Sequence, residues 1–152
     1  MAGPAQEVYV SRAALANKPQ PWSLGTPESA VRSYLDWTSY SFRIATSDAA
    51  TPTMDPAQAV RVDSYIQYNL EKGRLIDQTL ESISFGKLSV AATTTLVPAK
   101  ERWTYRYVST SKVGQSIGGP YTASYETTYG VVKSARGWLV TLASAKAIGD
   151  VK

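Results

Sequence analysis

The side chains of this sequence that could carry chemistry are carboxylates and aromatic rings. Histidine and cysteine are both absent, so Ser-His-Asp or Cys-His catalysis, Cys/His metal sites and disulfides are excluded. We therefore expect no metal and no cofactor. Proton abstraction would need a buried carboxylate, and the candidates are Asp36, Asp63 and Asp77. We expect Asp36 to face solvent, and we predict no catalytic residue.

Two segments place aromatic side chains at alternate positions, which is the spacing of one face of a β-strand. They are residues 101–108 (ERWTYRYV) and residues 121–129 (YTASYETTY). The alternating aromatic positions are Trp103, Tyr105, Tyr107, Tyr121, Tyr125 and Tyr129. If these rings face inward, Glu126 faces outward and pairs with Arg102 or Arg106, and these strands offer no inward Asp or Glu.

Two amphipathic helices are predicted to support these strands. Residues 26–28 (TPE) are typical of a helix start, and we expect that helix to run to about Ala45. It has two adjacent apolar stripes, so both of its flanks should be covered. Trp37 and Tyr40, on the second stripe, either pack in the core or line a ligand pocket. Residues 55–58 (DPAQ) start a second helix that ends at Gly73.

After the second helix the apolar period changes to two, which predicts strands from Arg74 onward. The apolar parity flips at Gly86, and this is typical of a β-bulge. We expect Pro98 to turn the chain into a strand over residues 100–110, with later strands over 121–133 and 138–145. Residues 1–25 contain KPQP at 18–21, which favours an extended arm or linker, with Trp22 and Leu24 docking it on the body.

This order of elements resembles that of the nuclear transport factor 2-like, or cystatin-like, proteins. Residues 26–35 (TPESAVRSYL) resemble the opening helix of bacterial members, and residues 103–107, 125–129 and 137–140 resemble their closing strands. The resemblance covers about residues 26–148 and suggests a bacterial, non-catalytic type. It implies an α+β cone, in which two N-terminal helices pack on a strongly curved, bulged antiparallel sheet of about four strands.

The fold alone does not choose an activity, because this cone carries enzymes, ligand binders and protein-interaction domains. Our first hypothesis is a non-catalytic binding or assembly domain of a larger exported or membrane-attached bacterial protein, with a homodimer or protein partner at the sheet. The alternative is a small-molecule-binding protein or a lyase/isomerase-type enzyme with an aromatic pocket in the cone. That pocket would hold a small apolar ligand near Trp37, and its lining residues would be Tyr34, Trp37, Tyr65, Trp103, Tyr105, Tyr125 and Tyr129.

The net charge of +4 comes from scattered cations and does not indicate a nucleic-acid-binding protein. Weak binding to nucleic acid or to an anionic surface would involve Lys87, Lys100, Arg102, Arg106, Lys112 and Lys133. No stretch reaches the ~20 apolar residues of a membrane span. We expect an extracytoplasmic or cell-surface location from the Ser/Thr-rich composition, with a cytoplasmic one left open.

Overall fold

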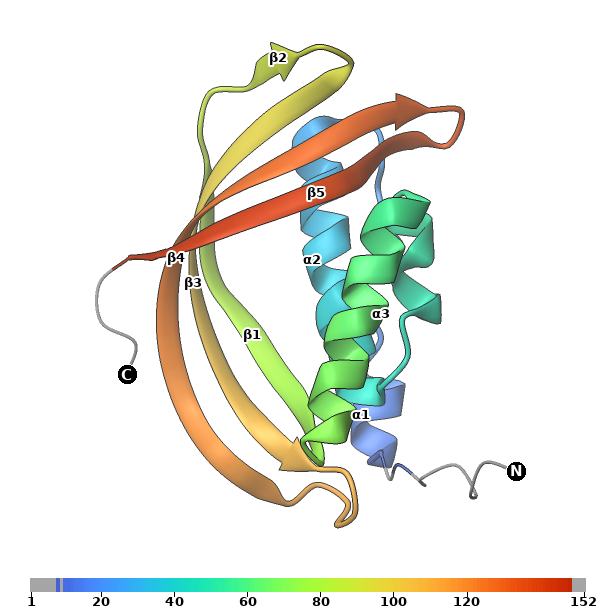
Figure 1. Cartoon of the computed structure of the whole chain (residues 1–152), viewed down its shortest axis with the longest axis vertical. Coiled ribbons are helices and arrows are strands. Elements are labelled where there is room, and N and C mark those ends of the chain that lie inside the picture. Colours follow the sequence, from blue (N-terminus) through green and yellow to red (C-terminus); the bar gives the residue numbers. More distant parts are fainter. Residues whose placement is uncertain (1–7, 9, 149–152) are drawn as a thin grey trace.

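The structure, a computed structural model, describes residue 8 and residues 10–148. Its helices are α1 (Arg12–Ala16), α2 (Pro27–Ile44), the 3-10 helix η1 (Asp48–Thr53) and α3 (Pro56–Glu71). Its strands are β1 (Arg74–Phe85), β2 (Ser89–Ala91), β3 (Thr94–Ser109), β4 (Ser116–Ser134) and β5 (Gly137–Ile148). They form one antiparallel sheet in the order β1-β3-β4-β5, with β2 paired to β3. The sheet curls strongly around α2 and α3, which confirms the predicted α+β cone (Figure 1).

The two long helices begin where their capping residues predict. The side chain of Thr26 accepts a hydrogen bond from the backbone N–H of Ser29 at 3.1 Å, and Asp55 does the same for Gln58 at 3.0 Å. Each cap is followed by a proline at the first helical position, where no N–H is needed. Helix α2 ends at Ile44, and its C-cap Ala45 takes a left-handed conformation with φ of 62° that stops the helix.

The core lies between the concave face of the sheet and the two long helices. Its fully enclosed members include Val31 of α2, Val97 of β3 and Val140 of β5. The loop into α3 is fastened to β5, because the Asp55 N–H donates to the Val140 carbonyl at 3.0 Å. The helices are therefore fixed against the strands that form the wall of the cone.

Strand β3 is longer than the sequence predicted, because Pro98 does not form a turn. The chain pairs from Thr95 onward with β4, and Pro98 lies opposite Thr128. Proline is tolerated there because the ladder between β1 and β3 has already ended at the pair Phe85–Ala99, so its missing N–H breaks no bond of that ladder.

The bulge predicted at Gly86 is also wrong. The register shift of β1 lies between Leu80 and Ser82, and Gly86 follows the end of that strand. A Cβ atom at Gly86 would approach Pro98 Cγ to 3.0 Å, so the glycine serves a close approach of two chain segments.

The described part of the N-terminal arm packs on α2, and it is not extended throughout as predicted, because it contains the short helix α1. The Tyr40 hydroxyl donates to the Leu15 carbonyl at 2.7 Å, and Trp37 Nε1 donates to the Gln20 carbonyl at 3.0 Å. Farther along, the carbonyl of Leu24 accepts a hydrogen bond from the Trp138 N–H at 2.9 Å. Gly137 must be glycine at this junction, because a Cβ atom would lie 2.5 Å from that carbonyl oxygen. The arm thus joins α2 to the turn between β4 and β5.

Within the described part of the chain, none of the helices has the length and apolar character needed to cross a bilayer.

Candidate functional site

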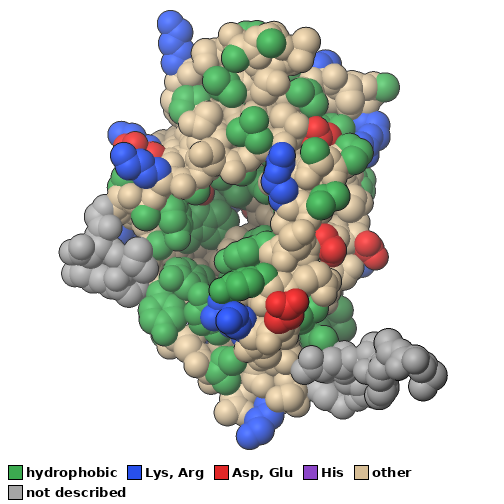
Figure 2. Space-filling model, in the orientation of Figure 1, with side chains coloured by type: hydrophobic (Ala, Val, Ile, Leu, Met, Phe, Trp, Pro, Cys, Tyr) green, Lys and Arg blue, Asp and Glu red, His purple; other side chains and the backbone are tan. Residues whose placement is uncertain are grey.

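A cavity of about 290 Å³ lies between α2, α3 and the concave face of the sheet. The space-filling view shows a hollow with hydrophobic side chains around it between the curled sheet and α3 (Figure 2). We call this cavity the cone pocket. Its lining residues are Tyr34, Leu35, Thr38, Phe42, Tyr65, Ile76, Gln78, Glu101, Trp103, Tyr105, Tyr107, Tyr125, Thr127, Tyr129, Ala143 and Ala145.

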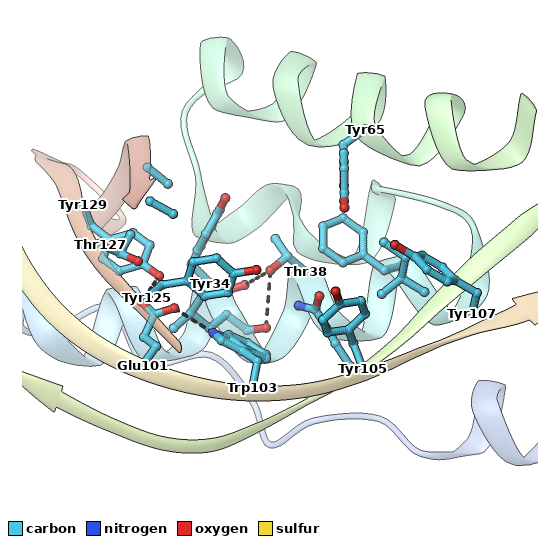
Figure 3. A pocket seen from close by; sticks show the side chains of 16 residues that line it. Tyr34, Thr38, Tyr65, Glu101, Trp103, Tyr105, Tyr107, Tyr125, Thr127 and Tyr129 are labelled. Atoms are coloured by element: carbon cyan, nitrogen blue, oxygen red, sulfur yellow. Dashed lines mark hydrogen bonds between the residues drawn. The ribbon is translucent and has the colours of Figure 1, made fainter. Parts of the chain in front are cut away.

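One end of the cone pocket holds a buried carboxylate. Glu101 is only 6% exposed. Its Oε1 accepts a hydrogen bond from Trp103 Nε1 at 2.8 Å, and its Oε2 accepts a short hydrogen bond from the Tyr129 hydroxyl. Figure 3 shows the three side chains together at this end, which we call the floor. The prediction that these strands offer no inward acid is therefore wrong.

The acids and arginines of the outer sheet face pair differently from the prediction. Arg106 bonds to Asp77 at 3.0 Å across β1 and β3, and not to Glu126. The register places Glu126 between Lys100 and Lys146 on the neighbouring strands. Asp36, predicted to face solvent, has a partly exposed side chain that pairs with Arg32 at 3.3 Å.

Two tyrosines near the floor are held in their neutral form. Burial raises the pKa of Tyr129, and the negative charge of Glu101 raises it further. Burial also raises the pKa of Tyr34, whose hydroxyl accepts a hydrogen bond from Gln58 Nε2 at 2.8 Å. These hydroxyls therefore keep their protons and act as hydrogen-bonding groups and not as bases.

The other end of the cone pocket is a half-exposed cluster of tyrosines, which we call the mouth. Tyr65 of α3 packs edge-to-face against Phe42 with ring centroids 5.4 Å apart, and Tyr105 packs in the same way against Tyr107 with centroids 5.9 Å apart. The Arg74 guanidinium lies 4.1 Å from the centre of the Tyr107 ring. Figure 3 shows Tyr65 and Tyr107 at the end of the cavity away from Glu101. The mouth thus combines aromatic rings with a positive charge.

Six of the seven residues predicted to bind a ligand line the cone pocket. They are Tyr34, Tyr65, Trp103, Tyr105, Tyr125 and Tyr129. Trp37 does not line it, because its indole bonds to Gln20 and meets Trp22 at 5.7 Å under the arm. The expectation of a pocket near Trp37 is therefore wrong. The binding role of the other six residues stays a prediction.

Several lining residues escaped the sequence analysis, and two of them, Glu101 and Thr127, are polar groups of the floor that had a clear signal. Glu101 has the same parity as Trp103, so the alternation that turns the tryptophan inward turns the acid inward too. Thr127 lies between Tyr125 and Tyr129 on the same parity. It is 4% exposed, and its hydroxyl has no hydrogen-bond partner in the described part of the chain.

Comparison with solved structures supports the fold. The intermembrane space region of the chloroplast protein ARC6 superimposes with a TM-score of 0.63 at 20% identity, over 86% of this chain and 100% of that one. The chain therefore shares the fold of that region, an α+β cone. An NTF-2-like protein of unknown function from Shewanella oneidensis aligns at 13% identity and a TM-score of 0.44, over 79% of this chain and 98% of that one.

The comparisons by sequence found no match. No protein-family model matches the chain, and no curated protein matches it. Among the residues that the structure describes, no group of three or more His, Cys, Asp or Glu side chains could hold a metal ion. The polar groups that line the cone pocket are the Glu101 carboxylate, the Gln78 amide, the Trp103 indole and several tyrosine and threonine hydroxyls.

Proposed function

We propose that this chain is a non-catalytic binding domain that takes a small ligand with an apolar body into the cone pocket. The observation that supports this most directly is the cavity itself, which ends on a buried polar group and is walled by aromatic rings. Its volume of about 290 Å³ is at the small end of the range for ligand sites, about 300–1,000 Å³. A cavity of this kind suits a ligand of roughly ten non-hydrogen atoms.

The floor is built for recognition more than for proton transfer. Both oxygens of Glu101 already accept hydrogen bonds from Trp103 and Tyr129. Both phenols are protonated near neutral pH, and the raised pKa values of Tyr34 and Tyr129 make their ionisation harder still. Neither phenol is therefore a base that could return a proton, and binding explains the site without a chemical step.

The proposal extends to the setting of the domain. We propose that it is part of a larger exported or membrane-attached bacterial protein, with a second copy or a protein partner at the sheet. The support is the Ser/Thr-rich sequence and the arm of residues 1–25, followed by the domain of residues 26–148. Light scattering at two protein concentrations tests the dimer, and a constant monomer mass would contradict it.

Three soluble probes of similar size test the ligand site: 2-phenylethanol, 2-phenylethylamine and 3-phenylpropionate. We expect at least one of them to bind with a dissociation constant below about 10 mM. Binding would be followed by NMR, where the indole N–H signal of Trp103 and the amides of residues lining the cone pocket should shift. If none of the three probes shifts these signals, the proposed function is wrong.

Two alanines of β5 offer a matched control for this experiment. Ala145 lines the cone pocket, whereas Ala147 has the same parity on the same strand and does not line it, and both are exposed. Ala145→Phe should fill the cavity and abolish binding, and Ala147→Phe should leave binding unchanged. Binding that survives Ala145→Phe would place the site elsewhere and contradict the proposal.

A lyase/isomerase-type enzyme is the second candidate function, because Glu101 places a carboxylate inside an aromatic pocket. A base of this kind would exchange the α-protons of a bound ketone with solvent. Cyclohexanone in deuterated water is a suitable probe. Deuterium uptake that the protein accelerates and Glu101→Gln abolishes would favour the enzyme, and uptake equal to that in buffer would exclude it for this probe.

A further inference from the structure

The floor of the cone pocket holds a carboxylate without a counter-charge. Both donors to Glu101, the Trp103 indole and the Tyr129 hydroxyl, are neutral. The ion pairs of the described residues are Arg32–Asp36 and Arg106–Asp77, and neither includes Glu101. An ionised carboxylate is costly to bury unless an opposite charge accompanies it. A positively charged ligand would supply that charge.

Thr127 gives a second indication that a polar group of a ligand belongs at the floor. Its hydroxyl is buried in the same cavity and makes no hydrogen bond of normal geometry within the described part of the chain, although it lies close enough to the Tyr129 hydroxyl to lower the pKa of that residue. Figure 3 places Thr127 at the same end of the pocket as Glu101. A buried hydroxyl without a partner loses free energy that a ligand donor could restore.

The walls next to the floor are also suited to a cation. Tyr34, Trp103 and Tyr129 surround Glu101 at this end of the cavity. Trp103 and Tyr129 turn their N–H and O–H groups toward Glu101, so the attraction for an ammonium group comes from the carboxylate, and burial among the rings strengthens it. A carboxylate inside an aromatic enclosure favours an organic ammonium over a neutral group of equal size.

We propose that the ligand of the cone pocket is an organic amine, whose ammonium group pairs with Glu101 and bonds to Thr127 at the floor. Its apolar body extends toward Tyr105 and Tyr107 at the mouth. This inference rests on the proposed function, because it names the class of ligand for the same site. Arg74 at the mouth fixes the direction of the ligand, since a cation placed there would be repelled.

The three probes of the previous subsection separate this inference from the proposed function. 2-Phenylethylamine is protonated at neutral pH, 2-phenylethanol is neutral, and 3-phenylpropionate is an anion. We expect the amine to bind about tenfold more tightly than the alcohol, because its hydrogen bond to Glu101 is charge-assisted on both sides. The anion should bind most weakly. Isothermal titration calorimetry or NMR titration gives the three dissociation constants.

The outcome of this comparison distinguishes the amine inference from the proposed function. If the alcohol binds as tightly as the amine, or the anion binds best near Arg74, the amine inference is wrong and the proposed function stands. If none of the three binds, both are wrong. This comparison uses the unaltered protein and does not depend on whether any variant folds.

Two variants test whether Glu101 and Thr127 are the residues that bind the ammonium group. Glu101→Gln keeps the size of the side chain and should reduce the preference for the amine over the alcohol to about twofold or less. Thr127→Val should weaken amine binding about threefold while the preference over the alcohol remains, because the carboxylate is still present. A Glu101→Gln protein that folds, as judged by its NMR spectrum, and keeps the tenfold preference would overturn the inference.

Discussion

The two faces of helix α2 use the same kinds of residue for different purposes. On the inner face Tyr34 reaches the cone pocket. Its ring lies edge-on to that of Tyr129, with centroids 6.2 Å apart, and its hydroxyl accepts a hydrogen bond from Gln58. On the outer face Trp37 and Tyr40 bond to backbone carbonyls of the arm. The inner rings line an open space, whereas the outer rings are covered by the protein's own chain. Aromatic side chains on a helix therefore indicate that another element packs against that face. Whether a cavity remains between the two depends on the shape of the opposing element.

The largest expected difference between the two faces comes from removing a tryptophan. Trp103 lies on the inner side and is 7% exposed, whereas Trp22 of the arm packs on Trp37 of the outer face and is 45% exposed. Trp103→Ala should lower the free energy of unfolding by about 3–5 kcal/mol, because it leaves a large cavity. Trp22→Ala should cost about 1 kcal/mol or less. Urea denaturation measures both values, and equal costs would contradict the comparison.

The second largest difference is expected at alkaline pH, which should lower the free energy of unfolding through the tyrosines of the inner face. Tyr34 and Tyr129 have raised pKa values in the folded protein, whereas in the unfolded chain they ionise near the ordinary value of 10.0. Their contribution to stability is complete below pH 10 and is lost as the pH rises above it, because only the unfolded state releases the protons. The free energy of unfolding should fall by about 1.4 kcal/mol per pH unit for each tyrosine.

Denaturation at several pH values between 9 and about 11 tests this loss. The Tyr34→Phe variant should show about half of the dependence that these two residues cause, since one of the two groups is gone. A slope that is unchanged in this variant would show that Tyr34 ionises equally easily in both states.

The smallest difference concerns one hydroxyl on each face. Tyr34→Phe leaves the amide of Gln58 buried without its partner, so we expect a loss of about 1–3 kcal/mol in the free energy of unfolding. Tyr40→Phe frees the carbonyl of the exposed Leu15, which water can reach, so the loss should be about 0.5–1 kcal/mol. Thermal denaturation with both variants side by side gives the order, and a reversed order would contradict the assignment of the faces.

Much of the fold could be predicted because local signals determine it. The caps at Thr26 and Asp55 fixed the starts of the long helices, and the alternation around Trp103 fixed the inward face of β3. Pro98 misled the prediction of where β3 begins, because the effect of a proline depends on whether a neighbouring strand needs its N–H. That requirement depends on the register between β1 and β3, which a single sequence does not encode locally.

The sequence predicted the aromatic rings of the candidate site but not its buried carboxylate, Glu101. Alternation placed Trp103 inward, and applied two residues earlier it would have placed Glu101 beside it. Once Pro98 was interpreted as a turn, Glu101 stood at the expected start of the strand. The prediction that Trp37 lines the pocket was wrong for another reason. Its helical position allowed either a core or a pocket role, and only the path of the arm over α2 showed which element covers it.

The arm has a mechanical consequence. A force that pulls on the N-terminal side of residue 15 meets a series of hydrogen bonds in chain order. They are Tyr40–Leu15, Arg43–Asn17, Trp37–Gln20, the two bonds of Ser33 to Ser23, and the pairing of Leu24 with Trp138. Each attachment lies on the outer side of α2 or at the turn between β4 and β5. Tension would therefore peel the arm away in steps before it reached the floor, so the cone pocket is insulated from load carried by this end of the chain.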